Sequence, residues 1–253
     1  MSNQTQTRQY LKPDLFPATV SARFTTRLGG VGQTPYDSFN TAFHVEDEFN
    51  SVESNRQLLK RDLDIQQIAW LDQVHGVEVV KADSSRALKA DALWTDEPGL
   101  ACAIQVADCM PVLVSNQQGT KVGAAHAGWR SLCDGVIPEL MSAMQLPPSE
   151  AIVWTGPCIQ QGAFEVGPEV KSAFKNSPAF MSLDVDMAFN PGAGDRFFAN
   201  LPMLAKIQLE AMRCQYLYQE DTCTYQASDR FFSFRRDGKT GRMSALIWIK
   251  SAE

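Results

Sequence analysis

The centre of the chain consists of apolar runs separated by very short polar turns. Residues 100–106 and 112–115 flank a turn at Asp108 and Cys109, and residues 121–126 follow a second turn at 116–119. Apolar runs of this length, bounded by turn residues, predict β-strands. Because strand follows strand here without a helix between them, the pattern disfavours a doubly wound parallel sheet.

Helical and strand patterns are mixed in the rest of the chain. Helices are expected at 50–61, 128–145, 169–175 and 201–213, the first beginning with a capping box of Asn50 and Glu53. Further strands are expected at 18–26, 68–71, 77–80 and 152–154, with a closing hairpin of 231–235 and 243–249. Mixing without regular alternation predicts an α+β layered fold, and the polar residues 1–9 are expected to form a frayed tail.

Composition limits the partners that the chain can bind. The formal net charge of −6 argues against a general binder of nucleic acid or anionic membranes. No apolar run is long enough to cross a membrane, and the first residues lack the apolar core of a secretion signal. A cytoplasmic protein is therefore expected, as a monomer, with its six cysteines as free thiols.

Histidine is rare in this chain, yet two of its three histidines lie near glycine at the ends of apolar runs. They are His75, which precedes Gly76, and His126, which lies two residues before Gly128, and Cys109 lies between them in the sequence. Imidazole and thiolate are ligands that zinc prefers, and three of them leave one position open for water or substrate. We therefore interpret His75, Cys109 and His126 as a candidate open metal centre, since ligands at adjoining strand ends can converge on one ion.

Each of these residues also has an ordinary structural interpretation. A histidine at a strand end is often only hydrogen-bonded to backbone, and a buried cysteine often packs as a small apolar side chain. Cys109 with a histidine base also matches the outline of a thiol nucleophile. Asp108 can orient a ligand histidine, act as a base, or stabilise the turn. A helix beginning at Gly128 can lower the pKa of a thiol or receive a phosphate.

A second group of polar residues lies nearer the N-terminus. Arg27, Asn40, His44 and Arg56 together indicate a pocket for an anion or a sugar, because arginine binds phosphate with two parallel hydrogen bonds. Taken singly, Arg56 reads as a solvated side chain and His44 as a loop histidine. The glycine-rich residues 29–32 lack the ending and the context of a phosphate-binding loop.

The chain resembles the bacterial YfiH-type family, described both as laccase-domain or multicopper polyphenol oxidases and as purine nucleoside phosphorylases. The matching segments occur in order over nearly the whole chain. They are TTRLGG (25–30), PYDSFNTAFHV (35–45), SNR (54–56), WLDQVHG (70–76), VADCMPVLV (106–114), AAHAGWRSL (124–132), TGPCI (155–159), FEVGPEV (164–170) and CTYQASDRFFSFRRDGKTGR (223–242). The departures from the family pattern are Ser131, where glycine is usual, and Phe39, where leucine is common.

The resemblance implies one layered α/β/β/α catalytic domain over residues 10–253, with zinc held by His75, Cys109 and His126 and copper as an alternative occupant. It implies phosphorolysis of adenosine, inosine and methylthioadenosine, together with adenosine deamination. The alternatives are a copper-dependent polyphenol oxidase, a peptidoglycan-editing hydrolase acting on muropeptide precursors, and a binding protein without turnover.

The residues favour the first of these functions. A multicopper oxidase needs several copper ions and many histidines, whereas this chain has three. A single open zinc polarises water, which suits hydrolytic deamination of adenine. For phosphorolysis, Arg27, Arg56 or His44 would hold phosphate, and Gln73 would donate to the leaving purine or to substrate hydroxyls.

Overall fold

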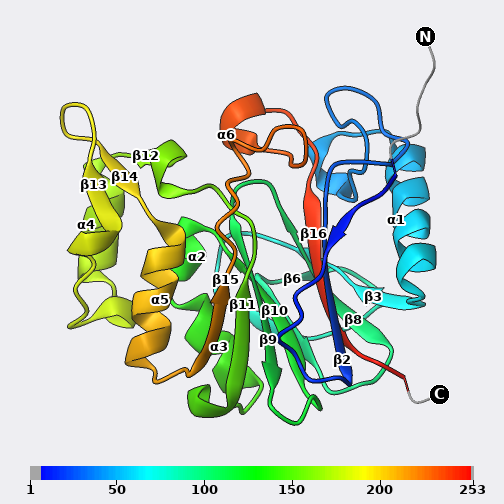
Figure 1. Cartoon of the computed structure of the whole chain (residues 1–253), viewed down its shortest axis with the longest axis horizontal. Helices are drawn as coiled ribbons and strands as arrows, with labels where there is room; N and C mark the ends of the chain where they lie inside the picture. Colours follow the sequence, from blue (N-terminus) through cyan, green and yellow to red (C-terminus); the bar gives the residue numbers. More distant parts are fainter. Residues whose placement is uncertain (1–6, 252–253) are drawn as a thin grey trace.

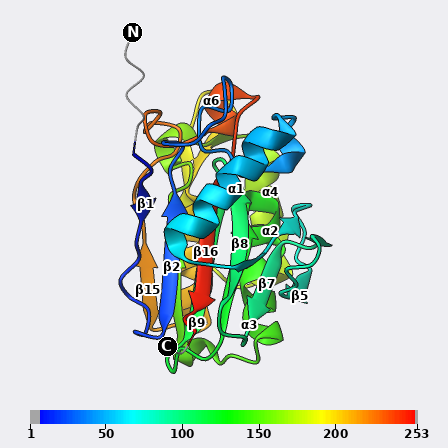
Figure 2. The same cartoon turned by 90° about the vertical axis from the view of Figure 1, so that its right-hand side faces the viewer.

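The computed structural model describes residues 7–251, in which two β-sheets pack face to face and helices cover both outer surfaces. Helix α1 (Phe49–Leu63) lies against one sheet, and α2 to α5 lie on the far side of the other (Figures 1 and 2). These four layers confirm the expected α/β/β/α architecture of a single domain.

The first sheet is largely antiparallel, with strand order β1-β2-β16-β8-β3. Its members are β1 (Tyr10–Leu11), β2 (Val20–Thr25), β16 (Met243–Ile249), β8 (Leu100–Val106) and β3 (Gln67–Ala69).

The second sheet has the order β15-β11-β9-β10-β7-β5. Its members are β15 (Tyr216–Gln219), β11 (Ala151–Thr155), β9 (Met110–Asn116), β10 (Val122–Ala127), β7 (Ala92–Thr95) and β5 (Val79–Lys81). Two smaller sheets are also present. One contains β12 (Glu165–Val166), β14 (Phe197–Ala199) and β13 (Phe189–Pro191), and the other contains β4 (Leu71–Asp72) and β6 (Leu88–Lys89).

The helices that cover the second sheet are short. They are α2 (Trp129–Cys133), α3 (Val136–Ala143), α4 (Pro168–Asn176) and α5 (Leu201–Ala211). Helix α6 (Phe234–Asp237) lies apart from them, at the upper end of the sandwich in Figure 1. Single 3₁₀ turns occupy Phe43–Val45, Pro148–Glu150, Gln161–Ala163, Pro178–Phe180 and Asp186–Ala188.

The central core lies between the two sheets. Successive residues of a strand point to opposite faces, so alternate positions of each strand reach this layer. Phe24 and Ile104 from the first sheet meet Leu113 and Trp154 from the second, and all four are essentially inaccessible to solvent. Each such side chain contributes about 1.5–3 kcal/mol by leaving water.

The intervening positions of the same strands face the helices. In β16, Leu246 and Trp248 pack with Leu59 of α1 on the outside of the first sheet. In β10, Ala125 packs in the outer layer of the second sheet, which also contains Leu140 of α3. The central strands are therefore buried on both faces, which explains their nearly unbroken apolar sequences.

The connection at residues 107–109 carries the chain from one sheet to the other. Strand β8 pairs with β16 and β3 in the first sheet, whereas β9 pairs with β10 and β11 in the second. The turn is shorter than expected, because Met110 and Pro111 already belong to β9. Cys109 consequently lies at the edge of the sandwich, between the two sheets.

Three sequence expectations are wrong in detail. The helix expected at 128–145 is two helices, because Gly135 adopts a positive φ of 94° between α2 and α3. The closing hairpin does not form, since residues 234–237 are helical and β16 pairs with β2 and β8. Helix α1 begins after Glu48, which makes no side-chain capping bond, so the expected capping box is absent from these described residues.

The N-terminal tail was expected to be frayed over residues 1–9, of which 1–6 lie outside the described residues. Arg8 is held in place, because its guanidinium donates to the carboxylate of Asp62 on α1 and to the backbone oxygen of Gly29. Among residues 7–251, no helix has the length and apolar character needed to cross a membrane.

Candidate metal centre

His75, Cys109 and His126 meet at the edge of the sandwich. His75 lies in the loop after β4, Cys109 in the connection between the sheets, and His126 near the end of β10. One ligand atom from each lies within 4.8 Å of the others, and Cys109 Sγ is 3.9 Å from His75 Nε2. The structure therefore brings together the three residues that the sequence pointed to.

The spacing and chemistry of these atoms fit a zinc ion. Zinc–sulfur and zinc–nitrogen bond lengths in a tetrahedral site place the two ligand atoms roughly 3.5 Å apart. The 3.9 Å between Cys109 Sγ and His75 Nε2 is close to that value. Imidazole nitrogen and thiolate sulfur are both ligand types of zinc, and three protein ligands leave a fourth position for water or substrate, as in catalytic zinc sites.

A buried carboxylate, Asp91, organises both histidines. Its Oδ1 accepts from His126 Nδ1 at 2.8 Å and from the His75 backbone N–H at 2.9 Å. Its Oδ2 accepts from the backbone N–H groups of Val74 and Gly76, at 3.1 and 2.6 Å. Donation from Nδ1 leaves His126 Nε2 for an ion, which is the usual arrangement around protein-bound zinc. The three backbone bonds hold His75 in the left-handed region, at φ 61°.

Sequence reasoning missed Asp91 and considered Asp108 as the residue that orients a histidine. Asp108 instead accepts from Thr224 Oγ1, Ser233 Oγ and the Arg235 backbone N–H, at 2.7, 2.9 and 2.7 Å. These bonds fix the turn before Cys109 and the start of α6. The only available signal for Asp91 was an acidic residue placed directly before a short apolar strand.

Charges within the centre stabilise one another. Burial opposes ionisation of Cys109, but the charge of His126 and hydrogen bonds from both histidines lower the pKa of the thiol to about 6. Burial likewise disfavours protonated His126, yet the Cys109 thiolate and the hydrogen bond to Asp91 raise its pKa to about 9. Cys109 is therefore prepared to be a thiolate, the form that binds metals.

A polar pocket of about 230 Å³ opens beside the three ligands. Its lining residues are His44, Gln73, His75, Gln105, Val106, Ala107, Cys109, His126, Phe234 and Arg242. We refer to it below as the polar pocket.

Arg242 supplies the positive charge of the polar pocket, and sequence reasoning missed it. Its backbone N–H donates to Asn40 Oδ1 at 2.9 Å, and its Nη1 donates to the backbone oxygens of Thr240 and Gly241. Burial lowers the pKa of Arg242, but a guanidinium still carries its charge at neutral pH. Desolvation and then the charge of Arg242 lower the pKa of His44, which keeps its imidazole neutral at pH 7.

Gln73 and Gln105 form one wall of the pocket. Gln73 Nε2 donates to the Gln105 backbone oxygen at 2.9 Å, and the Gln105 backbone N–H donates to Gln73 Oε1 at 2.8 Å. Gln105 Nε2 in turn donates to the Thr41 backbone oxygen at 2.8 Å. The amide of Gln73 is therefore fixed in position at the pocket surface.

The remaining residues of the expected anion pocket are placed elsewhere. Arg27 pairs with Asp37 and lies over the ring of Phe232, in a separate cleft with Ser228 and Asp229. The structure does not place Arg27 beside His44 or Gln73.

Arg56 also has protein partners. Its guanidinium lies over the rings of Phe43 and Trp70, at 4.4 and 4.0 Å, and Nε donates to the Thr41 oxygen. Burial lowers its pKa to about 10. Asn40 is fully buried and supports the backbone of Arg242 instead of lining the pocket. Of the group predicted for substrate binding, the pocket thus contains His44 and Gln73.

The fold and this site together define a four-layer sandwich with an open centre of two histidines and one cysteine. The sequence model of the family described as multi-copper polyphenol oxidoreductase laccase matches residues 21–250. The chain therefore belongs to this family, as the YfiH-type resemblance of its motifs indicated.

Similar proteins cover nearly the whole chain. A Pseudomonas aeruginosa protein named purine nucleoside phosphorylase PA4543 is 45% identical over 242 residues, which is 95% of this chain and 98% of that protein. The Escherichia coli protein named purine nucleoside phosphorylase YfiH is 41% identical, over 92% of this chain and 95% of its own. The crystal structure of Neisseria meningitidis protein NMB0706 has a TM-score of 0.91 and 40% identity, covering 96% of this chain and 99% of that one.

Proposed function

We propose that this protein is a zinc-dependent purine nucleoside phosphorylase that also deaminates adenosine. Its substrates would be adenosine, inosine or methylthioadenosine with phosphate, and its products a free base and the corresponding ribose 1-phosphate. The observation that carries the proposal is one open His–Cys–His centre directly beside a pocket with a partly buried arginine. The names of the relatives that match the chain end to end point the same way.

The residues of the polar pocket suit the binding of phosphate. Arg242 offers a fixed guanidinium, whose planar donors match phosphate oxygens. His44 is neutral and adds a hydrogen-bond donor without a second full charge. His44 thus stays a proposed phosphate ligand, and Arg242 replaces Arg27 and Arg56 in that role because neither of those arginines lines the polar pocket.

In the proposed phosphorolysis, a phosphate oxygen forms a bond to the anomeric carbon of ribose as the bond from that carbon to the purine nitrogen breaks. The base leaves with the electron pair of that bond and takes up a proton. His75, Cys109 and His126 would hold zinc, which supplies a Lewis acid that polarises oxygen when it is bound. Gln73, fixed by the Gln105 backbone, is positioned to orient substrate hydroxyls at the pocket wall.

A copper oxidase is the main alternative, because the family description refers to several copper ions. Electron transfer from one copper to a coupled cluster needs more than one metal centre. Within residues 7–251, the three-residue centre is the one group of metal-ligating side chains close enough to share an ion. This favours a single-ion enzyme, with copper as an alternative occupant of the same site.

The direct test is metal analysis of protein purified without added metal, followed by product analysis with adenosine in the presence and absence of phosphate. We expect close to one zinc per chain and adenine release that requires phosphate. Cys109→Ala should lose both zinc and turnover, whereas the matched control Cys214→Ala should lose neither.

Other outcomes would assign a different function. Base release without phosphate would indicate a hydrolase, and full turnover by metal-free protein would contradict the metal mechanism. Phenol oxidation that rises with added copper and survives Cys109→Ala would indicate adventitious redox chemistry. Turnover of muropeptide precursors without any turnover of nucleosides would favour the peptidoglycan-editing alternative.

A further inference from the structure

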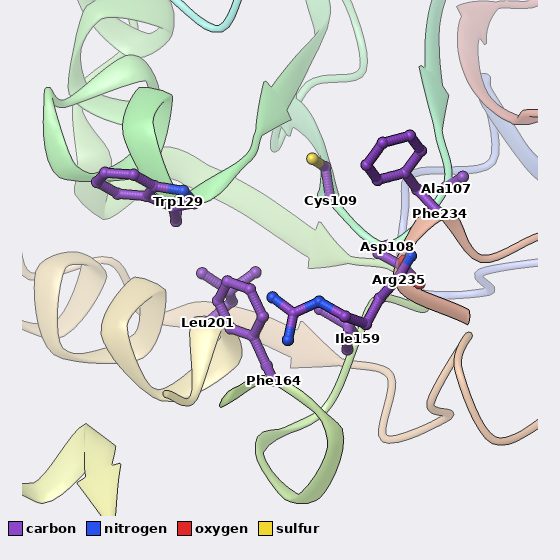
Figure 3. Close-up of a pocket in the computed structure, with 9 residues that line it drawn as sticks. All are labelled: Ala107, Asp108, Cys109, Trp129, Ile159, Phe164, Leu201, Phe234 and Arg235. Atoms are coloured by element: carbon purple, nitrogen blue, oxygen red, sulfur yellow. The ribbon is translucent and has the colours of Figure 1, made fainter. Parts of the chain in front are cut away.

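A second cavity lies on the other side of Cys109 from the polar pocket. It has a volume of about 130 Å³ and is lined by Ala107, Asp108, Cys109, Trp129, Ile159, Phe164, Leu201, Phe234 and Arg235. In Figure 3, the rings of Trp129 and Phe234 stand on opposite sides of the cavity, with Phe164 and Leu201 along a third side. We call this cavity the aromatic chamber.

The aromatic chamber and the polar pocket adjoin. Ala107, Cys109 and Phe234 line both of them, so the two cavities share a wall at the candidate metal centre. Their chemistry differs sharply, because the polar pocket presents imidazoles, amides and a guanidinium, whereas three aromatic rings surround the chamber.

Phe234 is 59% exposed, although it is a large apolar side chain beside the centre. The backbone that carries it is fixed nonetheless, because Asp108 accepts hydrogen bonds from Ser233 and Arg235 on either side of it. A rigid apolar ring left open at the mouth of a cavity is a surface that a flat ligand can cover.

We propose that the aromatic chamber binds the planar heterocyclic base of the substrate, while the polar pocket holds the ribose and the phosphate. This inference rests on the proposed function. A nucleoside joins a flat, largely apolar ring to a polyhydroxylated sugar through one bond. The aromatic chamber matches the ring and the polar pocket matches the sugar. The two cavities meet at Cys109, so the bond to be broken would lie beside the candidate metal ligands.

The size of the chamber agrees with this occupant. A closed protein cavity of about 150 Å³ admits a benzene ring. The aromatic chamber has about 130 Å³ and is bounded on one side by the exposed ring of Phe234, along which a second fused ring can extend. Deamination would require a different pose, in which the edge of the base that carries the amino group faces the polar pocket.

Arg235 is the charged residue of the chamber with N–H groups still available to donate. Its Nη1 bonds to the Glu165 backbone oxygen at 2.8 Å, and its guanidinium lies 5.2 Å from the centre of the Phe164 ring. The remaining N–H groups can donate to N3 or N7 of the purine ring, which are acceptors in both adenine and hypoxanthine. The carboxylate oxygens of Asp108 already accept bonds from Thr224, Ser233 and Arg235. Asp108 is the one carboxylate that lines the chamber, and these three bonds direct it to the turn and to α6. The chamber therefore has no acceptor dedicated to an exocyclic amino group, and we expect 6-amino and 6-oxo bases to bind within roughly tenfold of each other.

The test is calorimetric titration of adenine and of hypoxanthine into the full-length protein without phosphate, so that no turnover is needed. Stacking of a base on one aromatic ring raises affinity roughly 5- to 150-fold. Trp129→Ala and Phe234→Ala should each lower the affinity for adenine and for hypoxanthine by a factor in that range. Trp129→Phe and Phe234→Tyr retain a ring and should bind nearly as well as the wild-type protein.

Two controls make the result specific. Tyr216→Ala removes an aromatic side chain that is 48% exposed on β15 and lines neither cavity, and it should leave both affinities unchanged. Trp129 lines the aromatic chamber only, so Trp129→Ala should leave the affinity for inorganic phosphate unchanged. A thermal melt of each variant checks that it is folded.

Equal binding of both bases to the wild-type protein and to both alanine variants would overturn the proposal. A ratio of adenine to hypoxanthine affinity above roughly tenfold would contradict the absence of exocyclic recognition, because sites that hydrogen-bond such a group discriminate strongly. If the bases bind as expected but adenosine is not cleaved, the chamber stands and the proposed function fails. If adenosine is cleaved while the alanine variants bind the bases normally, the proposed function stands and the aromatic chamber is not the site of the base.

Discussion

The two histidines of the centre are held in opposite ways. His126 lies on the buried strand β10 and is 3% exposed, with its ring fixed by Asp91. His75 lies in an exposed loop and depends on backbone bonds to the same carboxylate for its left-handed conformation. The sheet thus supplies one rigid ligand, and a single buried side chain transfers that rigidity to a loop.

Removing either histidine should abolish metal binding, but only one removal should destabilise the fold. His126→Ala leaves the buried Asp91 carboxylate without its side-chain donor, at a cost of about 1–3 kcal/mol. His75→Ala removes an exposed ring and leaves the backbone bonds intact. We expect elemental analysis to find no zinc and assays to find no turnover in either variant. Thermal melts of the metal-free proteins should show a lower Tm for His126→Ala alone.

An equal loss of Tm in both variants would contradict the contrast between strand and loop. Retention of zinc by His75→Ala would show that the loop histidine is not a ligand.

Replacing Asp91 should weaken both halves of the centre at once. In Asp91→Asn, the amide NH₂ would face either the N–H groups of Val74 and Gly76 or those of His75 and His126, so one of these two sets of bonds must be lost. Loss of such a supporting carboxylate typically lowers metal affinity 10- to 100-fold. Competition with a zinc chelator would measure this change.

Asp108→Asn is the comparison variant, because this carboxylate bonds to Thr224, Ser233 and Arg235 instead of to a histidine. It should alter the zinc affinity far less than Asp91→Asn does. A larger loss in Asp108→Asn would show that the turn, and not the histidine-orienting carboxylate, controls the centre.

A methyl group at Gly128 should produce the smallest of these effects. A Cβ there would lie 3.0 Å from Cys109 Sγ and 3.1 Å from His75 Cδ2. Gly128 has an ordinary φ of −62°, so any change comes from crowding and not from backbone strain. Because the exposed ring of His75 can turn while its backbone stays fixed, we expect a cost of about 1 kcal/mol, or roughly a fivefold weaker zinc affinity.

Gly162→Ala is the matched control, since no atom lies within 4 Å of its added Cβ. An unchanged zinc affinity in Gly128→Ala would indicate that the loop adjusts freely, which would argue against the rigidity attributed to Asp91.

The sequence predicted that these three residues come together because imidazole and thiol side chains are rare and their positions at strand ends are easily recognised. It did not reveal Asp91, since a carboxylate before a strand looks the same whether it is buried or solvated. Arg242 was missed for a related reason. Its place in the pocket depends on Asn40, which is distant in sequence and was itself expected to bind substrate.

Local patterns also left the partners of each strand open. The apolar runs predicted strands on both sides of Cys109, but alternation along a strand does not say which sheet it joins. The expected hairpin at the C-terminal end failed because the Asp108 carboxylate and Ser233 cap a helix at 234–237. Gly135 ended the expected long helix because its positive φ interrupts helical geometry.

The passage of the chain from β8 to β9 has a mechanical implication. Cys109 is attached to both sheets through one short segment, whereas His126 belongs to the second sheet only. Met110, the next residue, pairs with Ala127, so Cys109 and His126 move together with the second sheet, whereas His75 follows β3 of the first sheet. Shear between the two halves of the sandwich would therefore act on the separation of Cys109 Sγ and His75 Nε2. An ion bridging these atoms would couple the halves, and amide hydrogen exchange along β8 and β10 should slow in concert when zinc is added.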